Sequence, residues 1–87
     1  MTKEKFIARL TEAETRWDLT IKSDYMNGVF IATTIKSTDP DRITIQSVCS
    51  DSITIDISES EIDVIDEDFK YSVTVEGIKF IICESIY

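Results

Sequence analysis

Residues 42–58 read RITIQSVCSDSITIDIS, and the tripeptide Ile-Thr-Ile occurs in them twice, at 43–45 and at 53–55. In both copies apolar and polar residues alternate, which is the period of a β-strand with one buried face. The offset of ten residues is too short for a solenoid repeat, so the copies are interpreted as two similar strands. We predict a hairpin with strands at about 42–48 and 52–58 and a turn at 50–51.

The same alternation continues on both sides of this hairpin. It predicts further strands at about 17–23, 29–36, 61–65, 69–76 and 78–84. Turns are predicted at 27–28 and 76–77, where Asn-Gly and Glu-Gly occur, and at 37–41, which contains Asp-Pro-Asp.

Two of these strands carry apolar residues on both faces. In 29–36, one face is predicted to hold Val29, Ile31, Thr33 and Ile35. Phe30 is on the other face, so we expect this strand to be central. In 78–84, Ile81 and Cys83 lie opposite Phe80 and Ile82, so this strand is either central or covered by a partner.

A change of parity separates the fourth and fifth predicted strands. Ile53, Ile55 and Ile57 are odd-numbered, whereas Ile62 and Val64 are even-numbered. One flat strand cannot bury both sets on the same face. We therefore predict a bulge or tight bend near 58–60, which lets the sheet curl into a partial barrel.

The segment before the first strand has a helical period instead. Its apolar stripe consists of Phe6, Ile7, Leu10, Ala13 and Trp17. Thr2 is a suitable N-cap, and Glu12 and Arg16 are spaced as a favourable ion pair. We predict a helix at about 3–16 that covers one face of the sheet.

These elements predict a single α+β domain over residues 1–87. An N-terminal helix packs on a curled, mostly antiparallel sheet of six or seven short strands, which forms a small partial barrel. The aromatic residues that fit core positions are Phe6, Trp17, Phe30, Phe69 and Phe80. In outline the arrangement resembles Sm-like and SH3-like small barrels, but no motif of those families occurs, and an architecture alone implies no function.

Few residues suited to catalysis are present. The chain has no His, its two cysteines lack CxxC spacing, and its two glycines are 49 positions apart, so no phosphate loop exists. We predict a protein that is not an enzyme and uses no cofactor or metal. Cys49 and Cys83 are expected to be reduced, buried thiols. A hydrolase with paired carboxylates ranks last among the alternatives.

The negative charge is concentrated in one part of the chain. The net charge is −8, and residues 43–69 hold eight acids and no base, whereas the remaining segments balance to zero. Direct binding to nucleic acid or to an anionic membrane is disfavoured, because counterion release needs Lys and Arg. A basic protein partner is favoured instead.

The acids are densest at 56–68, where seven of thirteen residues are Asp or Glu. Glu59, Glu61 and Asp63 alternate, so a strand would project them from one face at intervals of about 6.5 Å. Three interpretations compete. The row is a solvated strand face that blocks edge pairing, a calcium site that lacks the D-x-D-x-D-G pattern, or a surface complementary to a basic cleft.

The third interpretation leads to the predicted function. We expect an inhibitor that occupies the basic nucleic-acid-binding surface of a nuclease or another DNA- or RNA-handling protein, because carboxylates compete with phosphates for Lys and Arg. In size, charge and lack of catalytic groups, the chain resembles phage-encoded inhibitors, namely anti-CRISPR proteins and the uracil-DNA glycosylase inhibitor. The predicted partner-binding residues are Asp56, Glu59, Glu61, Asp63, Asp66, Glu67 and Asp68. Tyr25 and Met26 are predicted as secondary contacts.

The alternative function is that of a structural or oligomeric module built on a small barrel. Its basis is the last strand, with apolar side chains at both Ile81 and Ile82. Neither a signal peptide nor an apolar run of about 20 residues is present, which favours a cytoplasmic location. For a phage-encoded protein, this would be the cytoplasm of the host.

Overall fold

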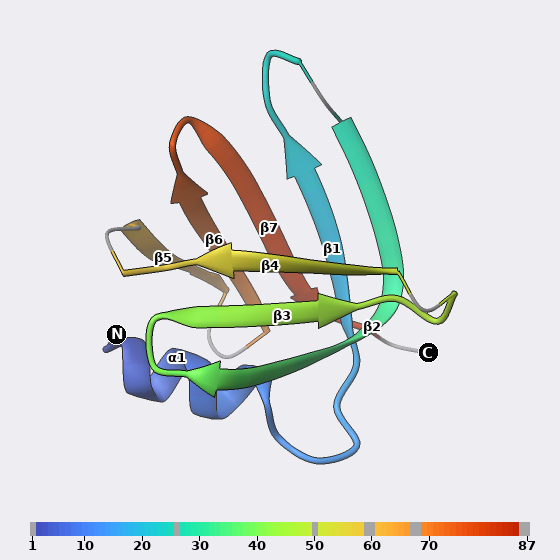
Figure 1. Cartoon of the computed structure of the whole chain (residues 1–87), viewed down its shortest axis with the longest axis vertical. Coiled ribbons are helices and arrows are strands. Elements are labelled where there is room, and N and C mark those ends of the chain that lie inside the picture. Colours follow the sequence, from blue (N-terminus) through green and yellow to red (C-terminus); the bar gives the residue numbers. More distant parts are fainter. Residues whose placement is uncertain (1, 26, 50, 59–60, 67–68, 86–87) are drawn as a thin grey trace.

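One helix and seven strands are present in the described part of the chain, which comprises residues 2–25, 27–49, 51–58, 61–66 and 69–85 of a computed structural model. In chain order they are α1 (Lys3–Leu10), β1 (Trp17–Lys22), β2 (Asn27–Asp39), β3 (Arg42–Gln46), β4 (Ser52–Asp56), β5 (Glu61–Asp66), β6 (Lys70–Val75) and β7 (Ile78–Glu84). The strands form one antiparallel sheet in the order β4-β3-β2-β1-β7-β6-β5 (Figure 1). The predicted α+β class with a curled sheet is confirmed.

β2 is shared between two parts of the sheet. Its first part pairs with β1, and its second part pairs with β3, so β2 is central, as predicted. Trp17 pairs with Thr33, whereas Leu19 pairs with Phe30. Between these two pairs β2 therefore holds one residue more than β1, which defines a β-bulge.

Ala32 occupies the bulge in a left-handed conformation, with a φ of 55°. Its N–H donates to the Asp18 carboxylate at 2.9 Å, which holds the bulge in place. Because the bulge shifts the alternation by one position, Val29 and Ile31 are exposed on the outer face, whereas Thr33 is buried. The prediction that these three residues share one face was therefore wrong.

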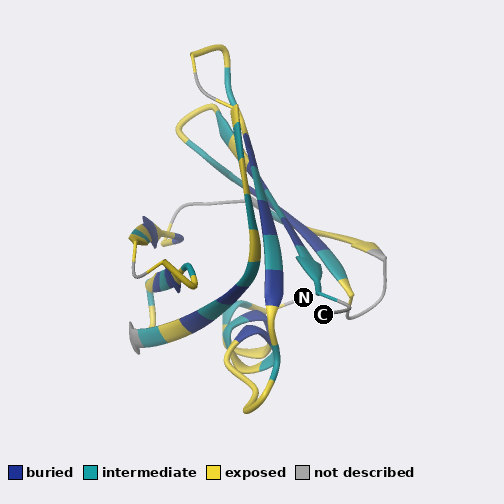
Figure 2. Ribbon diagram, turned by 90° about the vertical axis from the view of Figure 1, so that its right-hand side faces the viewer, coloured by how far each residue is buried: buried dark blue, intermediate teal, exposed yellow. Residues whose placement is uncertain are grey.

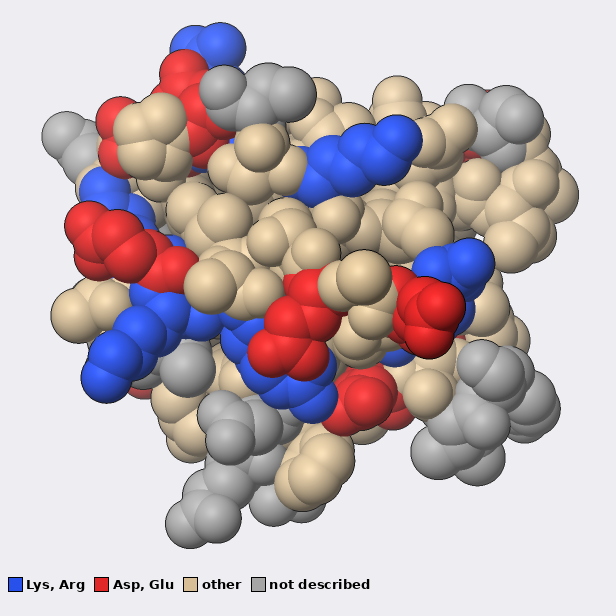
Figure 3. All heavy atoms as spheres, turned by 90° about the horizontal axis from the view of Figure 1, so that it is seen from below, with Lys and Arg blue, Asp and Glu red and all other residues tan. Residues whose placement is uncertain are grey.

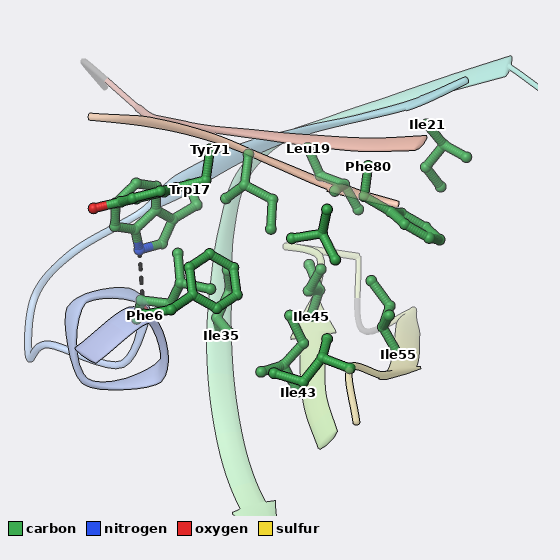
Figure 4. Packing of buried hydrophobic residues seen from close by; sticks show 14 residues of the cluster. Phe6, Trp17, Leu19, Ile21, Ile35, Ile43, Ile45, Ile55, Tyr71 and Phe80 are labelled. Carbon is green, nitrogen blue, oxygen red and sulfur yellow. Dashed lines mark hydrogen bonds between the residues drawn. The ribbon is translucent and has the colours of Figure 1, made fainter. Parts of the chain in front are cut away.

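The bend in β2 produces a half-barrel. It carries β3 and β4 across the inner side of the other strands (Figures 1 and 2). Figure 4 shows Ile43 and Ile45 of β3 and Ile55 of β4 pointing toward Leu19 and Phe80 of the opposing strands. The core fills the space between these two parts, and β4 and β5 remain as the two edges of the sheet.

α1 covers one end of the half-barrel (Figure 1). The Thr2 hydroxyl accepts a backbone N–H of the first turn, so the predicted N-cap is confirmed. Phe6 and Leu10 face the core and are buried. The Trp17 indole N–H donates to the Leu10 carbonyl at 3.0 Å, and the Arg9 guanidinium lies 4.9 Å from the centre of the indole ring. Within the described ranges, no helix has the length and apolar character that a membrane crossing requires.

The helix is shorter than the predicted 3–16, because Trp17 belongs to β1 rather than to the helical stripe. A continuing helix would pair the Leu10 carbonyl with the N–H of residue 14, but the indole N–H binds this carbonyl instead. Glu14 has a φ of 64°, which lies outside the helical region. The chain therefore leaves the helix after Leu10 and returns to start the sheet.

Two side-chain predictions for the helix fail for the same reason. Ala13 is exposed and is not part of an apolar stripe. Glu12 forms an ion pair with Arg9 at 3.1 Å, and the predicted pair of Glu12 with Arg16 is absent from the described ion pairs.

The central hairpin is confirmed. β3 pairs with β4 through Ile43 with Ile55 and Ile45 with Ile53. The predicted turn at 50–51 and the predicted bend at 58–60 lie partly outside the described residues. The change of parity has a simple origin, because β4 and β5 lie at opposite ends of the strand order and are not parts of one strand.

The turn predictions had unequal outcomes. The turn at 76–77 is confirmed, with φ values of 50° and 81°. Residues 27–28 begin β2, so the loop before it is 23–26, of which residue 26 lies outside the described part. β2 extends further than predicted, which confines the turn expected at 37–41 to residues 40–41.

Four side chains predicted in the core are not fully buried, and one of them, Phe30, is half-buried and packs against the core. Cys49 is exposed in the loop after β3, and Phe69, which precedes β6, is also exposed. Cys83 is half-buried on the outer face of β7, and both cysteines are free thiols. β7 itself lies between β1 and β6, so its apolar character fits a central strand.

The left-handed bulge residue predicts a stabilising substitution. Ala32→Gly should raise the free energy of unfolding by about 0.5–1 kcal/mol, because glycine adopts this conformation without the penalty of a Cβ atom. Ala8, which is exposed in α1, is the matched control. Ala8→Gly should lower the free energy of unfolding by about 1 kcal/mol. Urea denaturation measures both, and destabilisation by Ala32→Gly would contradict the bulge geometry.

Candidate functional site

The predicted acidic site is described for only part of its length. Asp56 lies at the end of β4, and Asp63 lies in the middle of β5, and both side chains are exposed. For Glu61 and Asp66 the backbone is described as the first and last residues of β5. The predicted contacts at positions 59, 67 and 68 lie outside the described residues.

β5 presents its acids along one edge of the half-barrel. Asp63 pairs with Ser72 and Glu61 with Thr74 in the register with β6, so these two acids have small neutral residues opposite them, whereas Asp66 pairs with Lys70. Ile62, which lies between the two acids, packs against the core. Since side chains alternate between the faces of a strand, Asp63 projects from the outer face and Ile62 from the inner face.

The hydrogen-bond pattern fixes which backbone groups β5 leaves free. The Glu84 N–H bonds the Phe69 carbonyl at 2.7 Å, so odd-numbered residues of β6 direct their backbone groups to β7. Ser72 therefore directs its backbone groups to Asp63. The two neighbours of Asp63 present their N–H and C=O groups at the unpaired edge of the sheet.

The described ion pairs do not neutralise Asp63. They join Lys3 to Asp41 and Arg9 to both Glu12 and Glu84, all near α1. Figure 3 views the molecule from the end that carries α1, and there basic and acidic side chains are interspersed. The described ion pairs thus lie at the helix end, and none of them includes Asp63.

Asp56 belongs to the opposite edge and has a different environment. It pairs with Arg42 across the β3–β4 hairpin. The backbone N–H of Ser58 donates to Asp56 at 2.9 Å, and this bond, followed by the Ser58 hydroxyl, is the main reason that the pKa of Asp56 lies below its ordinary value. Arg42 and Lys3 lower the pKa of Asp56 further, so this carboxylate stays ionised at neutral pH.

Lys3 connects the start of the helix to the same region. Its ammonium group donates to Asp41 at 2.9 Å, and this hydrogen bond is the largest cause of a raised Lys3 pKa. Asp41 precedes β3, and its carbonyl accepts the N–H of Ile57 at 2.7 Å. These contacts attach the chain after β4 to the turn before β3 and to the helix.

Two apolar pockets lie along β4, and sequence reasoning did not find them. One of about 220 Å³ is lined by Leu19, Phe30, Thr33, Ile45, Ser47, Asp51 and Ile53. The other, of about 250 Å³, lies between β4 and the β6–β7 hairpin and includes Ile53, Ile55, Val75, Ile78 and Phe80. Their lining comes from strands far apart in the sequence, so only the strand order reveals them.

Asp56 and Glu76 line the second pocket together, and the lowered pKa of Asp56 does not suit this carboxyl to the general-acid role of a two-carboxylate hydrolase. Among the residues that the structure describes, no group of three or more Cys, Asp or Glu side chains could hold a metal ion. Tyr25, one of the two predicted secondary contacts, is almost fully exposed, and Met26 lies outside the described residues.

Comparison with known proteins gives no relative, since no family model, no curated protein and no solved structure matches the chain.

The environment of Asp56 predicts a measurable pH dependence. Ser58→Ala removes the hydroxyl but keeps the backbone N–H, so the pKa of Asp56 should rise part of the way to its ordinary value. A depressed pKa contributes stability at pH values above the unfolded pKa, near 3.9, and this contribution is lost as the pH falls through the lower folded value. Carboxyl NMR titration of both proteins measures the shift. An unchanged Asp56 pKa in the variant would contradict the assigned role of the Ser58 hydroxyl.

Proposed function

We propose that this protein binds a basic partner and inhibits it by occupying its nucleic-acid-binding surface. The observation that carries the proposal is the exposed carboxylate of Asp63 on an edge strand, within a segment of 27 residues, 43–69, that contains eight acids and no base. In the register of β5 with β6, neutral Ser72 and Thr74 lie opposite Asp63 and Glu61, whereas Asp66 lies opposite Lys70.

Electrostatics explains why such a surface would select this class of partner. Sites that bind nucleic acid present Lys and Arg to phosphate oxygens, and carboxylates form the same charge-assisted hydrogen bonds. Because β5 pairs regularly with β6 from Glu61 to Val64, before the irregularity between Val64 and Asp66, Asp63 is held on a regular element, and little ordering is needed on binding. Electrostatic attraction would make association fast and sensitive to salt.

Capture experiments test the proposal. The protein is immobilised and presented with lysate of its source organism or of that organism's host, over a series of salt concentrations. We expect the captured proteins to bind nucleic acid, to dissociate as salt increases, and to be displaced by added DNA or RNA. Capture of proteins that nucleic acid does not displace would reject the proposal.

A matched pair of double variants assigns the surface. Glu61→Gln with Asp63→Asn should weaken binding about 1.5- to 5-fold per carboxylate, as expected for exposed charge pairs. Glu4→Gln with Asp24→Asn removes the same charge from exposed positions in the balanced part of the chain and should have little effect. Equal losses in both variants would show that only the net charge matters.

A second candidate function rests on the outer face of the sheet. Val29 and Ile31 of β2 are 64% and 56% exposed, and Val29 and half-buried Ile81 flank Thr20 in the registers of β1 with β2 and β7. These apolar side chains favour the oligomeric module as the runner-up. Light scattering separates the candidates, because a stable closed oligomer supports the module and a monomer supports the inhibitor.

A further inference from the structure

The edge of β4 that faces away from β3 is unpaired. Among the described residues, β4 is the end of the strand order and pairs with β3 alone. The Ile57 N–H bonds the Asp41 carbonyl at 2.7 Å, and the Ser47 N–H bonds the Asp51 carbonyl at 2.8 Å. Since hydrogen-bonded pairs alternate in an antiparallel ladder, the odd-numbered residues of β4 direct their backbone groups to β3.

The even-numbered residues of β4 therefore present their backbone groups at the free edge. These residues are Ser52, Thr54 and Asp56. Their N–H and C=O groups form a template onto which an extended chain can add as a further strand.

An apolar groove accompanies this edge. The pocket of about 250 Å³ between β4 and the β6–β7 hairpin has Ile55 and Phe80 in its wall. Ile53 lines this pocket and also the pocket of about 220 Å³. A strand added to β4 would lie over this groove, and every second side chain would point into it. The edge supplies main-chain hydrogen bonds, and the groove supplies sites for alternate apolar side chains.

The charges on the groove select a cationic occupant. Asp51 lines one pocket, and Asp56 and Glu76 line the other. Neither pocket has Lys or Arg in its lining, although Arg42 of β3 pairs with Asp56 from outside the pocket. A second copy of this chain would bring the same carboxylates and a net charge of −8 to the interface, so pairing of two β4 edges is disfavoured. A segment in which basic and apolar residues alternate can place its apolar side chains in the groove and its basic side chains next to these carboxylates.

We propose that the β4 edge and its groove bind an extended segment of alternating basic and apolar residues, which joins the half-barrel as an eighth strand. This inference rests on the proposed function, which supplies the basic partner. It adds that the partner contributes an extended segment to the interface. β5 then attracts the basic surface, while β4 provides the contact that depends on shape and backbone pairing.

A peptide is the probe for this site. We would titrate a short capped peptide of alternating lysine and valine into the isotope-labelled protein and follow the backbone amides by NMR. We expect the largest shifts at the amides of Ser52, Thr54 and Asp56, together with slower hydrogen exchange at these positions. A peptide of alternating glutamate and valine should not bind.

Two substitutions of one residue separate edge pairing from charge attraction. Thr54→Pro removes the N–H at the free edge but no hydrogen bond to β3, and proline is tolerated on edge strands. Thr54→Val keeps the N–H, and both variants lose the hydroxyl contact with Thr44. We expect Thr54→Pro to weaken peptide binding by about tenfold, which equals one or two net hydrogen bonds, and Thr54→Val to change it little.

The outcomes distinguish this inference from the proposed function. Peptide binding that Thr54→Pro leaves unchanged would overturn the edge site, while salt-sensitive capture of basic proteins would still support the inhibitor. Dimer formation through β4, seen by sedimentation and abolished by Thr54→Pro, would also overturn the inference, because the occupant of the edge would then be a second copy of this chain. If Thr54→Pro does not fold, a peptide N-methylated at alternate residues replaces it, and unimpaired binding of that peptide would reject strand addition.

Discussion

The change of pairing partner along β2, with its bulge at Ala32, is the constraint on which the rest of the structure depends. Because β2 gives its first part to β1 and its second part to β3, the sheet neither stays flat nor closes. Trp17 joins the other elements to this bend: its carbonyl accepts the Thr33 hydroxyl at 2.6 Å, and its indole N–H holds the Leu10 carbonyl at the end of α1. Trp17 is thus the residue at which the bend, the helix and the core meet.

A half-barrel built in this way has two edges, and they differ in chemistry. β5 carries the exposed carboxylate of Asp63 on its outer face, and charged side chains on an edge discourage pairing with other chains. β4 has neutral residues over most of its length and an apolar groove beside it. In the function proposed above, β5 would attract a basic partner over a distance, and β4 would recognise it at close range.

Local patterns were sufficient to predict the elements, but long-range pairing was not accessible from them. The Ile-Thr-Ile hairpin, the odd-numbered core residues of β1 and the turn at 76–77 follow from short-range periodicity, and all are present. The bulge could not be predicted, because Ala32 has no propensity for a left-handed conformation and depends on the hydrogen bond that its N–H donates to Asp18, fourteen residues away. The early end of the helix likewise depends on Trp17. The acidic segment was visible in the sequence, whereas the groove at β4 needed the strand order.

Backbone amide hydrogen exchange tests most directly the claim that the sheet is an open half-barrel with two unpaired edges. We expect exchange rates to alternate along both edges. Exchange should be slow at Ile53, Ile55 and Asp63, whose N–H groups face a neighbouring strand, and fast at Thr54 and Val64, whose N–H groups face outward. Uniform protection along β4 and β5 in the free monomer would contradict the account, because it would mean that the two edges are paired and the barrel is closed.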